Sequence, residues 1–137
     1  MSRTNLTSHV LVPVANEDDA RVTAKALEPY SVGHVTVVHV VEKGEGVPDK
    51  TPVEQSESLA AESFAAFRET FPDAESRMTY RRDVVEGIVD VADDIDASAI
   101  AFHPRESGRI VKLLTGDRTL HLVTSAPLPI IALPHPE

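Results

Sequence analysis

Short apolar runs alternate with longer amphipathic segments along the whole chain. Two Val-rich runs cover residues 9–14 (HVLVPV) and 34–41 (HVTVVHVV), and the second holds five Val in eight positions. Such a run is typical of a strand that is covered on both faces. Residues 76–82 alternate more weakly and predict an edge strand, and the apolar runs at 98–102 and 129–133 predict two further strands.

The segments between these runs have the spacing and the end signals of helices. Asn16, followed three residues later by Asp19, predicts a helix start, and Gly33 predicts its stop. A second helix is predicted from about 53 to 71, after a Gly- and Pro-containing loop at 43–52. Its apolar stripe, which we interpret as packing against a sheet, consists of Ala60, Phe64, Phe67 and Phe71.

The third predicted helix carries an apolar stripe and an acidic stripe. Asp83 and Glu86 resemble a capping pair, and the helix is expected to run to about residue 96. The apolar stripe consists of Val85, Ile88, Ala92 and Ile95. The acidic stripe consists of Asp83, Glu86, Asp90, Asp93 and Asp94. Clustered carboxylates can bind a divalent metal, but a solvated helix face is the favoured interpretation. Further helical turns are predicted from about 110 to 125.

The alternation of strands and helices predicts an α/β fold. Strands that are separated by helix-length segments require crossover connections and therefore a parallel sheet with helices on both faces. We expect one three-layer, doubly wound domain that covers residues 1–137. Ligands of such sheets bind beyond the carboxyl ends of the strands, at the place where the strand order reverses.

The charge of the chain excludes several classes of partner. The 137 residues contain 13 Lys and Arg against 22 Asp and Glu, which gives a net charge of −9. Nucleic acids and anionic membranes both attract basic surfaces, so neither is an expected partner. The chain has no Cys, and no apolar run approaches the roughly 18 residues of a membrane span. We expect a cytoplasmic protein that does not insert into membranes.

The basic residues are mostly arginine, with nine Arg and only four Lys. An acidic, Lys-poor surface suits a protein from a salt-loving source, and it also occurs in ordinary acidic proteins. Unchanged folding stability between dilute buffer and molar KCl would contradict the salt-loving hypothesis.

The familiar catalytic and phosphate-binding motifs are absent from the sequence. There is no G-x-G-x-x-G after the first strand, no G-K-[ST] and no G-x-S-x-G. The six His have no close metal-binding spacing. His39 lies inside a Val-rich strand, which favours a hydrogen-bonded structural role. His103 follows the strand at 98–102 and therefore lies at the ligand-binding end of the sheet. We predict no catalytic residue and no metal site.

Several segments, in this order and spacing, resemble the universal stress protein family over essentially the whole chain. They are HVLVPV at 9–14, VTVVHVVE at 35–42, LLTG at 113–116 and SAPLPIIAL at 125–133. The resemblance implies a Rossmann-like, adenine nucleotide alpha hydrolase-like sheet of five parallel strands in the order 3-2-1-4-5. It also implies a homodimer through the final strand at 129–133, protein clients of unknown identity, and a role in stress survival or its regulation without established enzymatic chemistry.

The nucleotide site that the resemblance implies is degenerate in this sequence. Family members that bind ATP resemble G-x-x-G-x9-G-[ST] after the fourth strand. Alignment on Gly116 puts His103 and Glu106 at the first two Gly positions and Asp117 at the Ser/Thr position. The acid that often follows the first strand in ATP-binding members aligns with Ala15. The remaining positions of the implied site are Pro13, Val14 and Val41.

These departures affect phosphate binding directly. Glycines let a backbone approach phosphate closely, whereas His103 and Glu106 add bulk there. Glu106 and Asp117 also place negative charge where a triphosphate would lie. As an N-cap, Asp117 would use the helix N–H groups that otherwise attract an anion. The sequence therefore predicts weak or no ATP binding and no cofactor.

Two alternatives remain open. Residues 103–118 carry four basic residues against two acidic ones, and Arg recognises phosphate well. A nucleotide or another anion could therefore bind in a different pose on Arg105, Arg109 and Arg118. The other alternative is a small α/β enzyme in which His103 is an acid or a base, which requires a partner carboxylate within hydrogen-bond reach.

Overall fold

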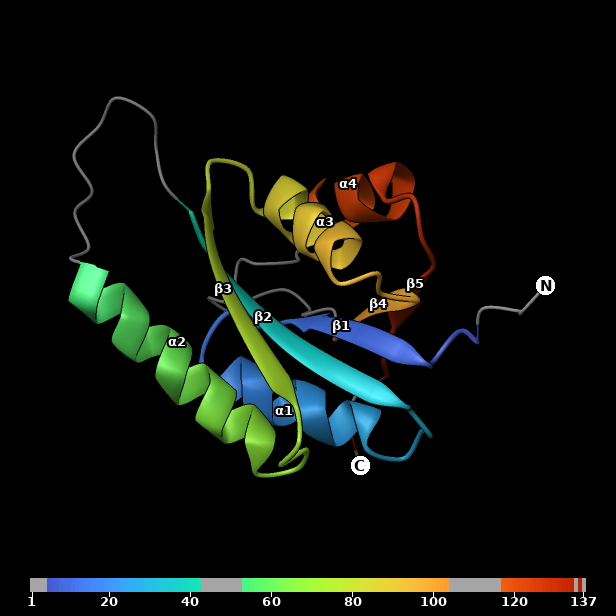
Figure 1. The fold of residues 1–137 in the computed structure, drawn as a ribbon, viewed down its shortest axis with the longest axis horizontal. Coiled ribbons are helices and arrows are strands. Elements are labelled where there is room, and N and C mark those ends of the chain that lie inside the picture. Colours follow the sequence, from blue (N-terminus) through green and yellow to red (C-terminus); the bar gives the residue numbers. More distant parts are fainter. Residues whose placement is uncertain (1–4, 43–52, 104–116, 135, 137) are drawn as a thin grey trace.

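The computed structural model describes residues 5–42, 53–103, 117–134 and 136. In these residues, strands and helices alternate, as the pattern predicts (Figure 1). The strands are β1 (His9–Pro13), β2 (His34–Glu42), β3 (Glu75–Arg81), β4 (Ala99–Phe102) and β5 (Ile130–Ala132). The helices are α1 (Glu17–Leu27), α2 (Val53–Arg68), α3 (Val84–Asp94) and α4 (Asp117–Ser125). The predicted loop at 43–52 and the helical turns at 110–116 lie outside the described residues.

The five strands form one parallel sheet in the order β3-β2-β1-β4-β5. Helices α1 and α2 cover one face of this sheet, and α3 and α4 cover the other (Figure 1). The predicted fold class and strand order are therefore confirmed. Strand β3 lies at one edge, as predicted for the weakly alternating segment, whereas residues 35–40 of β2 are buried. None of the described helices is long and apolar enough to cross a membrane.

Two apolar clusters, one on each face of the sheet, form the core. Alternate residues of β1 supply both clusters, because successive side chains of a strand point to opposite faces. Val10 and Val12 join the cluster under α1 and α2, whereas Leu11 joins the cluster under α3.

The apolar stripe of α2, which continues to Phe71 beyond the helix end, packs into the core, as the sequence predicts. Ala60 and Phe67 are buried, and Phe64 and Phe71 pack partly buried against the cluster under α1 and α2. The rings of Phe67 and Phe71 are stacked, with centroids 5.3 Å apart.

The acidic stripe of α3 caps the helix and pairs with the neighbouring edge strand. Asp83 is the N-cap, and its Oδ1 accepts hydrogen bonds from the backbone N–H groups of Val85 (2.9 Å) and Glu86 (3.3 Å). Farther along, Asp90 pairs with Arg81 of β3 at 3.3 Å, and Asp94 pairs with Arg77 at 3.6 Å. The carboxylates of this face therefore neutralise the arginines of β3. Exposed pairs of this kind contribute little to stability.

The predicted role of Gly33 as the stop of the first helix is wrong. Helix α1 ends at Leu27 with Glu28 as its C-cap, directly before Pro29. Gly33 instead precedes β2, and its N–H donates to the carbonyl of Thr7 at 2.8 Å. A Cβ at this position would lie 2.7 Å from the carbonyl oxygen of Ser8. Glycine is therefore required by the close approach of two chain segments. The helix predicted to reach residue 71 ends at Arg68. Apart from the predicted start near 110, which lies outside the described residues, the other predicted element ends are about one or two residues from the observed ones.

Candidate functional site

The carboxyl edge of the sheet is the place where the sequence predicts a ligand site. Strand β1 pairs with β2 on one side and with β4 on the other, so the strand order reverses between β1 and β4. Val14 and His103 directly follow the ends of these two neighbouring strands. This is the position at which parallel α/β sheets bind ligands.

The backbone of Val14 is held by the neighbouring strand β2. Its N–H donates to the carbonyl of Val38 at 3.0 Å. Its own carbonyl accepts a hydrogen bond from Nδ1 of His39 at 3.1 Å, which requires the proton of the neutral ring to be on Nδ1. Burial lowers the pKa of His39 below its ordinary value of 6.5, and the bond to Val14 partly opposes this shift. The predicted structural role of His39 is confirmed.

The buried, neutral His39 predicts that acid destabilises the fold. The folded state disfavours the protonated ring, whereas the unfolded chain takes up a proton near pH 6.5. The free energy of unfolding is therefore expected to be fully retained above this pH and to fall as the pH drops below it. The pKa of His9 is also lowered, by burial and by the neighbouring His34, and acts in the same direction.

The variant His39→Asn isolates this contribution, because asparagine keeps a donor near the Nδ1 position but does not titrate. Urea unfolding followed by circular dichroism should show a smaller stability loss between about pH 7.5 and about pH 5 in the variant than in the natural chain. Equal losses would contradict the prediction. If the variant does not fold, an NMR titration of the His39 ring in the natural chain tests the prediction instead. A pKa at or above 6.5 would contradict it.

The turn from β1 into α1 is closed by side-chain hydrogen bonds to the backbone. Asn16 is the N-cap of α1, and its Oδ1 accepts from the N–H of Asp19 at 2.8 Å, as predicted. Oδ2 of the buried Asp19 accepts from the N–H of Ala15, the residue before the N-cap, at 2.7 Å. The hydroxyl of Thr23 donates to the other carboxylate oxygen at 3.4 Å. The chain's own carboxylate therefore already accepts the N–H of Ala15, two residues after the end of β1.

The remaining predicted site residues lie in several parts of the chain. Pro13 is the last residue of β1, and the half-buried Val41 is near the end of β2. His103 is buried, with 8% of its surface exposed. Asp117 is the first residue of α4, and Arg118 is the second. The predicted positions that lie outside the described residues are Arg105, Glu106, Arg109 and Gly116.

The first turn of α1, which lies at this edge, is acidic. Glu17, Asp18 and Asp19 occupy the first turn of α1, where their charge is favourable for the helix dipole. Arg21 pairs with Glu17 at 3.3 Å and with Glu69, the residue directly after α2, at 3.0 Å. Within residues 5–42, 53–103 and 117–134, no group of three side chains is arranged to hold a metal ion.

Comparison with protein families matches residues 7–134 to the model of the universal stress protein family. The chain belongs to this family. The resemblance noted in the sequence is thereby confirmed at the level of the family and its role in the stress response. No curated protein matches this universal stress protein significantly.

Solved structures confirm the fold. A universal stress protein from Archaeoglobus fulgidus is 24% identical, with a TM-score of 0.63 and coverage of 93% of each chain. A universal stress protein from the same organism in complex with dAMP is 20% identical, with a TM-score of 0.66; 95% of this chain and 100% of the other are covered. A universal stress protein in complex with cAMP is 13% identical, with a TM-score of 0.61 and coverage of 96% and 98%.

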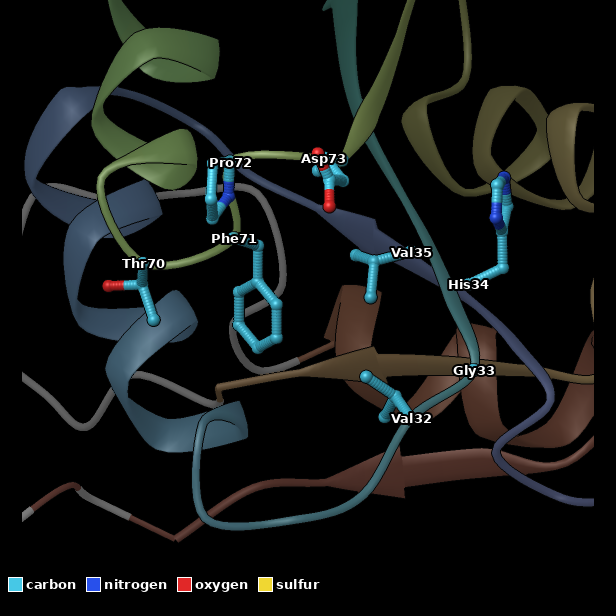
Figure 2. A pocket seen from close by; sticks show the side chains of 9 residues that line it. Val32, Gly33, His34, Val35, Thr70, Phe71, Pro72 and Asp73 are labelled. Atoms are coloured by element: carbon cyan, nitrogen blue, oxygen red, sulfur yellow. The ribbon is translucent and has the colours of Figure 1, made fainter.

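Two features of this universal stress protein escaped the sequence analysis. The first is the contact of the Asp19 carboxylate with Ala15; an acid three residues after an N-cap is a recognised signal for a bond to the N–H of the cap itself, whereas here the donor is the preceding residue. The second is a hollow of about 210 Å³ at the opposite, amino edge of the sheet (Figure 2). Val32, Val35, Phe71 and Asp73 are among its lining residues. No sequence motif marks this hollow, because it arises between two loops that only the fold brings together.

Proposed function

We propose that this universal stress protein is a regulatory or interaction protein that does not bind ATP. The observation that carries the proposal is the turn between β1 and α1. The N–H of Ala15 and the N–H of Asp19 both have acceptors within the chain itself. A phosphate at this edge would have to displace those acceptors and approach three carboxylates of the first helical turn.

The degenerate motif supports the same conclusion. Two of its glycine positions hold His103 and Glu106, and the hydroxyl position holds Asp117. His103 follows β4 as a buried side chain, and α4 begins at Asp117. Two like charges a few Å apart cost on the order of 1 kcal/mol in water and several times more at lower effective dielectric. A triphosphate beside Glu106 and Asp117 would meet this penalty at each carboxylate.

A second candidate function is a sensor of a nucleotide or another anion. Two structural neighbours were solved in complex with dAMP and cAMP, which favours this candidate. In this chain, the basic residues of the stretch 103–118 would supply the phosphate contacts, with Arg105, Arg109 and Arg118 in the leading roles. The enzymatic alternative with His103 as acid or base has no comparable support.

Isothermal titration with ATP, ADP and AMP separates these candidates. We expect no binding of ATP in the micromolar range, because the site lacks the glycines and adds carboxylates. Micromolar binding of ATP to the natural chain would refute the proposal. Binding of AMP alone would establish the sensor.

A triple variant, His103→Gly, Glu106→Gly and Asp117→Ser, restores the motif and provides a positive comparison. Gain of ATP binding in this variant would attribute the loss to these three positions. If the variant folds and still fails to bind, the three replacements do not explain the loss.

The proposal includes the assembly and setting of the protein. We propose a single domain over residues 1–137, a homodimer paired through the final strand, and a cytoplasmic location. Strand β5 lies at the edge of the sheet, and an apolar edge strand readily pairs with another chain. The charge of −9 supports a salt-loving source, for which the KCl titration described above is the test.

A further inference from the structure

The hollow at the amino edge exists because β3 starts to pair with β2 farther along β2 than β1 does. Strand β2 pairs with β1 from His34 onward, but its pairing with β3 starts only at Thr36 and Glu75. Residues 32–35 therefore have no strand paired with them on the β3 side. The turn at 70–74 lies on that side and is separated from them by a gap. The space between these two segments, which we call the amino-edge hollow, measures about 210 Å³. This is below the roughly 300 Å³ of typical ligand pockets, so it suits a small molecule.

Both walls of the hollow are held in place by hydrogen bonds to backbone carbonyls. On one wall, the N–H of Gly33 donates to the carbonyl of Thr7 at 2.8 Å. On the other, the N–H of Ala74 donates to the carbonyl of Phe71 at 3.0 Å, and Nε of Arg68 donates to the carbonyl of Ala74 at 2.9 Å. A hollow with such walls is formed before a ligand arrives, which reduces the ordering cost of binding.

The hollow has a mixed polar and apolar lining that includes one carboxylate. Figure 2 shows Val32, Val35 and Phe71 around the space and Asp73 at its rim, whereas the imidazole of His34 points away. His34 instead pairs with Glu75 at 3.2 Å. Asp73 is exposed and takes part in none of the ion pairs between described residues.

These features select the charge of the ligand. An anion would meet Asp73 in a protein that already carries a net charge of −9. The nearby Arg68 keeps its positive charge, but its guanidinium is directed to the carbonyl of Ala74 and to Oγ of Ser76 at 3.0 Å. It is in none of the ion pairs between described residues, so Asp73 is not neutralised by direct contact. A cation is instead attracted by the carboxylate of Asp73. The face of an aromatic ring such as that of Phe71 adds to this attraction.

We propose that the amino-edge hollow binds a small organic ammonium ion. The ammonium group pairs with Asp73, and a short apolar body lies against Val32, Val35 and Phe71. This site is on the opposite edge of the sheet from the degenerate nucleotide site. It is therefore independent of whether the protein binds ATP.

The test is an NMR titration of the ¹⁵N-labelled chain with n-butylammonium chloride, at a KCl concentration at which the chain is folded. Sodium butyrate serves as the probe of equal body and opposite charge. We expect saturable amide shifts confined to residues 32–35 and 70–74 with the ammonium ion, and none there with butyrate. Asp73→Asn should weaken binding by about fivefold, the upper range for an exposed ion pair.

Asp93→Asn is the matched control, because Asp93 is an exposed carboxylate on α3, on the other face of the sheet. This variant should bind n-butylammonium like the natural chain. Equal binding of butyrate would overturn the proposal, as would shifts spread over the whole acidic surface. Equal affinities of the two asparagine variants would also overturn it.

Discussion

Replacement of Phe67 by alanine is expected to lower the free energy of unfolding by about 3–5 kcal/mol, the usual cost of removing a fully buried Phe. Phe67 is 0% exposed, belongs to the cluster under α1 and α2, and stacks on Phe71. Its removal would leave a cavity that the surrounding strands cannot fill. Because domains of this size are stable by only about 5–15 kcal/mol, the variant should lose a large part of its stability.

Urea unfolding followed by circular dichroism measures this loss, and Leu59→Ala is the matched control on the same helix. Leu59 is 39% exposed, so its truncation should cost much less than that of Phe67. Similar losses in the two variants would show that α2 does not pack through the Phe stripe.

Replacement of Ile131 by glutamate is expected to convert the proposed dimer into a monomer. Ile131 is the middle residue of β5, which lies at the sheet edge. A carboxylate there would face its own copy across paired final strands, and like charges across a strand pair are destabilising. Light scattering coupled to gel filtration reports the mass directly. A natural chain that is already monomeric, or a variant of unchanged mass, would contradict strand-mediated pairing.

Two further variants keep this result interpretable. Ile131 packs partly buried against the cluster under α1 and α2, so a charge there also affects the fold. Ile131→Ala removes the same contact without adding charge, and it should leave more dimer than the glutamate variant. Leu59→Glu adds the same charge on α2, away from β5 (Figure 1), and should leave the mass unchanged.

Features that depend on residues close together in the sequence could be predicted, and features that depend on distant residues could not. The cap of α1 was predictable, because Asn16 and Asp19 lie within one turn of each other. The burial of β2 was predictable, because a strand covered on both faces needs apolar residues at every position. Gly33 was misinterpreted because its cause is not local. The neighbour that excludes a side chain there is Ser8, which lies 25 positions earlier in the chain.

The candidate site divides in the same way. The proposed replacement of motif glycines by His103 and Glu106 was inferred from the sequence alone. The hydrogen bond from the Ala15 N–H to Asp19 is visible only in the structure, because the sequence does not give the orientation of the carboxylate. The contact between His39 and Val14 joins two strands, so the sequence indicated a structural role for His39 without naming its partner.

The sequence by itself determined the alternation of elements, the parallel α/β class, the family resemblance and the acidic character of the chain. These properties follow from local periodicity, from composition and from short segments in a fixed order. The tertiary structure alone decided how Gly33 meets Ser8 and where Asp73 stands relative to Phe71 and Val35. It also decided that β3 pairs with β2 only from Thr36 onward. The physical reason is that these features are spaces and contacts between segments far apart in the chain, and only packing sets their separation.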